Sequence, residues 1–142
     1  MRKHFLITIQ IILISTISVS AKIKIDTVDF WHVFYNKKII SGYNELSSKP
    51  QIIVKIHDIK ETDVLSVEYG DDTPDDDIKT GLYIKEDRVK NILANGKGTS
   101  NPLKISVSRI FAICKHFNKQ HLDFYYFDKK HDRFIFQLKF VN

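Results

Sequence analysis

Alternation of apolar and polar side chains over short segments constrains the fold of this chain more than any other feature. Residues 122–128 and 133–141 both alternate in this way, and the polar loop 129–132 separates them. Such a pair of segments is typical of a β-hairpin. Residues 51–57 and 64–69 repeat the pattern, with apolar side chains on one face. The chain is therefore expected to be mainly β.

The remaining segments complete this prediction. Further strands are expected at residues 22–26, 28–35, 39–43, 82–85 and 103–107, while 89–93 fits either a strand or a short helical turn. Ile110, Ile113, Cys114 and Phe117 fall on helical spacing and predict one short helix. Long crossover helices are absent, which argues against a parallel α/β sheet. We expect an antiparallel, Greek-key-like β-sandwich of about 7–8 strands with one short helix, and a small β-barrel is the alternative.

The N-terminal segment has the layout of a secretory signal peptide. A basic head at Met1 to His4 precedes an apolar run at 5–14 and a small-residue run at 15–21, with cleavage expected after Ala21 or Ser20. A retained membrane anchor is the alternative, but the apolar run has only half of the roughly 20 residues that a spanning helix needs. The prediction is export to the periplasm, the cell surface or the extracellular space, without a membrane span after cleavage.

The mature part, residues 22–142, has the size of one β-rich domain. Its single cysteine, Cys114, excludes an internal disulfide and is expected to be buried as a small apolar residue. Abundant lysine, isoleucine, asparagine and phenylalanine are common in AT-rich bacterial genomes and indicate a bacterial source. The chain has a formal net charge of +5, but its basic residues are dispersed, and export argues against a nucleic-acid partner.

An acidic loop is the first candidate site. The carboxylates that could converge on a cation are Asp71, Asp72, Asp75, Asp76 and Asp77. Calcium prefers roughly six to eight oxygen ligands, and a turning backbone adds carbonyls to carboxylates. The spacing is not that of an EF-hand, and a solvated loop without a metal is the alternative. No other cofactor is expected.

The aromatic side chains of the last hairpin form the second candidate site. One face of this hairpin is expected in the core, and the other is expected to carry Tyr125, Phe127 and Ile135. An exposed group of such residues is typical of an interaction surface. The alternative is that the domain covers both faces itself.

Catalytic signals are weak. His32 and the adjacent pair His57 and Asp58 could transfer protons, but the sequence has no nucleophile elbow and no His-Glu-x-x-His motif. The sequence therefore favours a small non-catalytic binding module for a protein or glycan partner, of which an inhibitor or immunity protein is one version. The alternatives are a small Asp/His hydrolase, with or without calcium, and a structural subunit of a surface assembly.

Overall fold

The computed structural model describes residues 29–44, 46–47, 50–70 and 73–142. The predicted signal peptide, the predicted strand at 22–26, and Asp71 and Asp72 of the acidic loop lie outside these described residues.

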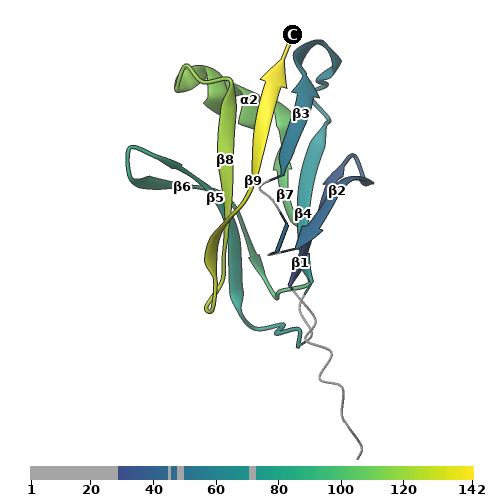
Figure 1. The fold of residues 1–142 in the computed structure, drawn as a ribbon, viewed down its shortest axis with the longest axis vertical. Helices are drawn as coiled ribbons and strands as arrows, with labels where there is room; N and C mark the ends of the chain where they lie inside the picture. The colour runs from purple at the N-terminus through teal and green to yellow at the C-terminus, as the bar shows by residue number, and fades with distance from the viewer. Residues whose placement is uncertain (1–28, 45, 48–49, 71–72) are drawn as a thin grey trace, which may run out of the picture.

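Two β-sheets pack face to face in the described part of the chain (Figure 1). The four-stranded sheet has the order β2 (Lys38–Asn44), β1 (Phe30–Tyr35), β4 (Val64–Gly70) and β7 (Leu103–Ser106). The five-stranded sheet has the order β3 (Gln51–Lys55), β9 (Asp132–Val141), β8 (His121–Phe127), β5 (Lys79–Glu86) and β6 (Val89–Lys97). Helix α2 (Val107–His116) connects β7 to β8, and the short 3-10 helix η1 (Ile56–Asp58) follows β3.

This architecture confirms the predicted fold class, a mainly β sandwich, with one α-helix in the described part of the chain. The described strands form two separate sheets rather than a closed barrel. One pairing differs from the antiparallel expectation, because β3 runs parallel to β9, with Gln51 opposite Gln137 and Lys55 opposite Val141. A parallel pair needs a long connection. Here the whole chain from β4 to β8 lies between the two strands.

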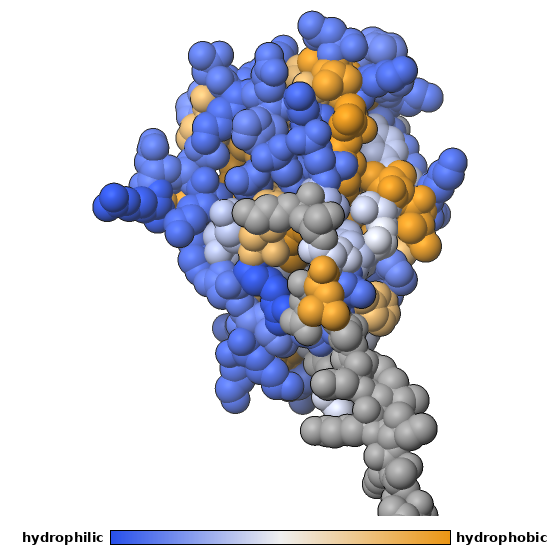
Figure 2. All heavy atoms as spheres, in the orientation of Figure 1, coloured by the Kyte–Doolittle hydropathy of each residue, from blue (hydrophilic) through white to orange (hydrophobic). Residues whose placement is uncertain are grey.

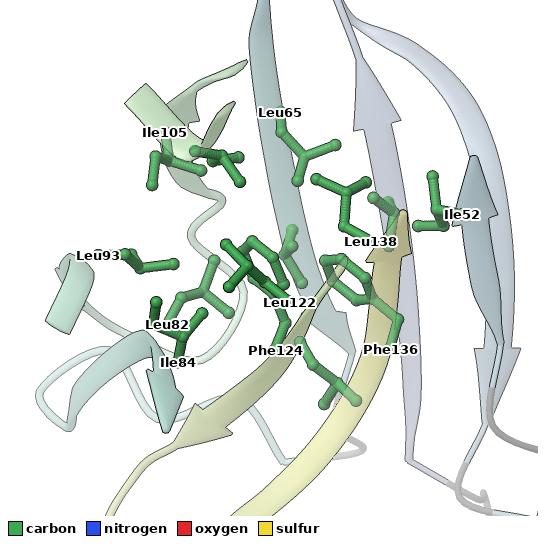
Figure 3. Close-up of a cluster of buried hydrophobic side chains, with 14 of the residues drawn as sticks. Ile52, Leu65, Leu82, Ile84, Leu93, Ile105, Leu122, Phe124, Phe136 and Leu138 are labelled. Atoms are coloured by element: carbon green, nitrogen blue, oxygen red, sulfur yellow. The ribbon is translucent and has the colours of Figure 1, made fainter. Parts of the chain in front are cut away.

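The core fills the space between the sheets with the inward side chains of both (Figure 3). Ile52 of β3, Leu65 of β4, and Phe124 and Phe136 of the last hairpin are all buried. The rings of Phe124 and Phe136 stack with centroids 4.7 Å apart. Burial of each such side chain contributes about 1.5–3 kcal/mol, so the alternating pattern decides which face of each strand turns inward.

Helix α2 begins at Val107, directly after its N-cap residue Ser106. The Ser106 side chain accepts a hydrogen bond from the backbone N–H of Arg109 and caps the first turn. The helix buries Val107, Ile110 and Cys114, which confirms the expected position of the cysteine. Burial raises the pKa of the Cys114 thiol to about 11. In the described part of the chain, no helix has the length and apolar character needed to cross a membrane.

Candidate functional site

A β-bulge in the last hairpin changes the membership of the predicted aromatic patch. Phe124 pairs with Phe136, but the next residue, Tyr125, pairs with Phe134, so Ile135 is an extra residue in β9. Ile135 turns into the core and is only 2% exposed. The structure therefore places Ile135 on the opposite side of the sheet from Tyr125 and Phe127, and Phe134 takes its place on the outer face.

We define the aromatic face as Tyr83, Tyr125, Phe127 and Phe134, which lie on the outer side of the five-stranded sheet. The rings of Tyr83 and Tyr125 stack with centroids 5.0 Å apart, and Phe134 meets Tyr125 edge-on at 5.8 Å. The ring centroid of Phe127 lies 6.1 Å from that of Tyr83. The strands β5, β8 and β9 each contribute to this face, so cross-strand register brings its four rings together.

Glycine makes room for one of these rings. Phe127 lies over Gly81 of β5, where a Cβ atom would be 2.4 Å from the Phe127 Cε1 atom. Any larger residue would displace the ring. The aromatic face therefore depends on Gly81 as well as on its own four residues.

Charged groups flank the aromatic face and hold Tyr83 in position. Asp132 accepts hydrogen bonds from the Tyr83 hydroxyl and from the Lys90 ammonium. The bond from Lys90, followed by that from Tyr83, holds the pKa of the Asp132 carboxyl below its usual value. Burial is the main cause that raises the pKa of Tyr83 and of Tyr125. Both hydroxyls therefore stay protonated at neutral pH and act as hydrogen-bond donors.

The described carboxylates of the acidic loop are exposed and partly engaged with the protein. The Asp75 carboxylate accepts a hydrogen bond from the backbone N–H of Asp77 at 3.0 Å, and Asp77 forms an ion pair with Lys97 at 2.6 Å. Asp76 is also exposed. Among the described residues, no group of three or more potential ligands is arranged to hold a metal ion. The calcium site stays a prediction, because Asp71 and Asp72 lie outside the described part.

The candidate catalytic residues lie on two different elements, with His57 and Asp58 on η1 and His32 on β1. His57 and Asp58 form an exposed pair on η1, with 3.2 Å between the His57 Nε2 and Asp58 Oδ1 atoms. His32 is on β1, where its ring packs against that of Phe30 with centroids 4.9 Å apart. Asp58 lines a groove of about 500 Å³ together with side chains of β2 and β3, and no histidine is among the described lining residues.

A pocket that the sequence analysis did not identify lies beside the first half of β9. β3 pairs only with Gln137 to Val141, so residues 132–136 extend beyond it. The pocket there has a volume of about 430 Å³. Its described lining comprises Trp31, Tyr43, Asn44, Ser47, Pro50, Arg133, Phe134 and Ile135. No local pattern indicates this pocket, because residues from β1, the end of β2 and β9 meet only in the folded sandwich.

A network of charged groups borders this pocket. The Arg133 guanidinium lies over the Trp31 ring, 5.1 Å from its centroid, and donates to the Asp29 carboxylate at 3.2 Å. The His131 Nε2 atom lies 3.5 Å from the Asp29 Oδ2 atom, and its Nδ1 atom lies 3.0 Å from the Asp128 Oδ2 atom. Burial raises the pKa of Asp128, but hydrogen bonds from His131 and from the backbone N–H groups of Lys130 and His131 outweigh it, and the net pKa is lowered.

Comparisons of the chain with protein-family models, with curated proteins and with solved structures find no match.

Proposed function

We propose that this chain is an exported, non-catalytic binding module that engages a protein partner through the aromatic face. The observation that carries the proposal is the grouping of four aromatic rings on the outer side of the five-stranded sheet, away from the core. Tyr125, Phe127 and Phe134 are each partly exposed. Aromatic residues are enriched in protein interfaces, where tyrosine combines apolar area with a polar hydroxyl.

The orientation of the rings favours a protein over a glycan. A sugar ring stacks on the free flat face of an aromatic ring. Tyr83 stands between β6 and β8, with the Lys90 ammonium 4.7 Å from its centroid on one side and Tyr125 on the other. Tyr125 in turn lies between Tyr83 and Phe134. Tyr83 is only 3% exposed and its hydroxyl is bonded to Asp132, so it supports the face from below. The partly exposed Tyr125 has its ring faces covered by its neighbours and presents an edge, which suits the mixed apolar and polar surface of a protein.

The test uses the mature domain, immobilised to capture its partner from a native extract, followed by affinity measurement with the purified partner. Replacement of Tyr125 by Ala removes a central ring, and loss of an interface hot spot costs about 2 kcal/mol, or roughly a 30-fold weaker Kd. Ile53→Ala is the matched control, because Ile53 is exposed on β3, away from the aromatic face, and its truncation should leave the Kd unchanged.

Two results would contradict the proposal. One is a partner whose affinity is the same for the wild type and for Tyr125→Ala. The other is a captured ligand that proves to be a glycan free of protein and whose affinity Tyr125→Ala lowers. Circular dichroism of the variant separates either outcome from unfolding.

A further inference from the structure

Two residues that line the pocket beside β9 carry buried hydrogen-bonding groups without a partner among the described residues. Trp31 is 2% exposed, and its indole N–H has no hydrogen-bond acceptor in the described part of the chain. The hydroxyl of Tyr43, whose ring stacks on Trp31 with centroids 5.9 Å apart, is also buried without a partner. Each unsatisfied buried group costs about 1–3 kcal/mol, and native proteins contain few of them. Because both residues line the same pocket, one occupant could satisfy both groups.

The other polar residues of the pocket have partners within the protein. The Ser47 hydroxyl donates to the Asn44 side-chain oxygen at 3.0 Å, and the Asn44 backbone N–H donates to the Ser47 oxygen at 3.1 Å. The indole N–H is a donor only, whereas the phenol is both donor and acceptor. The occupant must therefore offer an acceptor to Trp31.

The charge of the pocket distinguishes between kinds of acceptor. Arg133 brings a positive charge, but the Asp29 carboxylate at 3.2 Å offsets it. A carboxylate ligand would lose much of its hydration and gain little net attraction here. Pro50 and Ile135 add apolar lining. A neutral acceptor with an attached apolar group matches this combination best.

We infer that this pocket binds a neutral amide group, whose carbonyl oxygen accepts a hydrogen bond from the Trp31 indole N–H and from the Tyr43 hydroxyl. A peptide backbone and an N-acetylated sugar both carry this group. The pocket shares Phe134 with the aromatic face, but its hydrogen-bonding groups belong to Trp31 and Tyr43, so it adds a small-ligand site to the proposed binding module.

The sequence supplies a direct probe, because Trp31 is the single tryptophan of the chain. Its indole N–H gives one resonance in a proton–nitrogen correlation spectrum. We expect a saturable downfield shift of this resonance on titration with N-acetylglycine N-methylamide or with N-acetylglucosamine at tens of millimolar. The compound that binds more tightly shows whether the natural amide comes from a peptide or from an N-acetylated sugar. Sodium acetate should give no saturable shift.

Variants separate the pocket from the rest of the protein. Tyr43→Phe keeps the ring and removes one hydrogen bond, which should weaken amide binding between about twofold and tenfold. Ile53→Ala changes an exposed residue of β3 outside the pocket lining and should leave the titration unchanged. A pocket filled only by water would leave the indole resonance unmoved by both amides, and that result would overturn the inference. An equal response to acetate would also overturn it. Neither result bears on partner binding by the aromatic face, which the Tyr125→Ala experiment tests alone.

Discussion

Asp63 connects more of the fold than any sequence pattern around it suggests. Its carboxylate accepts hydrogen bonds from the Tyr35 hydroxyl at 2.6 Å, the Asn36 side chain at 2.7 Å and the Lys60 backbone N–H at 2.8 Å. Its carbonyl oxygen accepts from the Val107 N–H at 2.9 Å. One residue therefore joins the β1–β2 hairpin, the start of β4 and the start of α2. Burial of a carboxylate is tolerated here because several donors satisfy it.

This network predicts a loss of stability in acid. The hydrogen bond from Lys60, followed by those from Tyr35 and Asn36, lowers the pKa of Asp63 below its ordinary value of 3.8. The unfolded chain therefore binds this proton more readily than the folded protein. The stabilising contribution is complete above the ordinary pKa and disappears as the pH falls through the lower folded value. Asp63→Asn should be less stable at neutral pH and should lose less stability on acidification.

Urea unfolding of both proteins, from neutral pH to below the ordinary carboxyl pKa, measures this difference. Asp58→Asn is the control, because Asp58 is exposed and its removal should leave the acid dependence of the wild type. The pKa values of Asp128 and Asp132 are also lowered. The unfolding free energy of Asp63→Asn should therefore still fall with decreasing pH, but with a smaller slope than that of the wild type. An identical slope in Asp63→Asn and the wild type would show that Asp63 does not contribute to acid unfolding.

At the scale of the elements, two hairpins use the same strained turn. Asn36 and Lys37, which connect β1 to β2, have φ angles of 49° and 69°. Asp87 and Arg88, which connect β5 to β6, have φ angles of 48° and 69°. Turns with two positive φ angles match the twist of adjacent strands and favour Asn-Gly or Asp-Gly. The first residue of each turn follows this preference, whereas the second carries a long side chain in a region that suits glycine.

Replacement of the second turn residue by glycine should therefore stabilise the domain. For Lys37→Gly and for Arg88→Gly we expect a gain of about 0.5–1 kcal/mol each, because relief of the left-handed strain exceeds the added flexibility of the unfolded chain. A higher urea midpoint with an unchanged slope measures the gain. Lys38→Gly is the matched control, since it lies in β2 outside the positive-φ positions, and it should be destabilising. A lower midpoint for both turn variants would disprove the strain argument.

The elements also show what local sequence determines. Alternation correctly predicts the inward faces of β3, β4 and β8, because one side of each strand meets the core. It misplaces Phe134 and Ile135, because a bulge adds one residue and reverses the faces beyond it. Tyr83 joins the aromatic face through its pairing with β8, and such a pairing depends on register between distant segments. The pocket at Trp31 is harder still to predict, since it depends on how the sheets meet.

At the scale of the whole molecule, the two sides of the sandwich differ. On one side, β6 and β7 approach closely, and Gly96 lies where a Cβ atom would be 2.7 Å from the Leu103 side chain. On the other side, β2 and β3 are edge strands, and a groove lies between them. Figure 2 shows apolar side chains gathered along this side, to which the exposed Ile39, Ile40 and Ile53 belong. An exposed apolar edge is a site where another strand is able to pair.

This open side gives the structural-subunit alternative its specific prediction. We expect the protein to self-associate as its concentration rises, with β3 as the contact, so that sedimentation velocity detects larger species. Ile53→Lys places a charge on this edge and should abolish the association, because a charged edge disfavours strand pairing. Val89→Lys is the matched control. Both residues are 60% exposed, but Val89 begins β6, which is the opposite edge of the five-stranded sheet. A wild-type protein that stays monomeric at the highest concentration would exclude assembly through β3, and equal loss in both variants would indicate general repulsion between charged molecules instead.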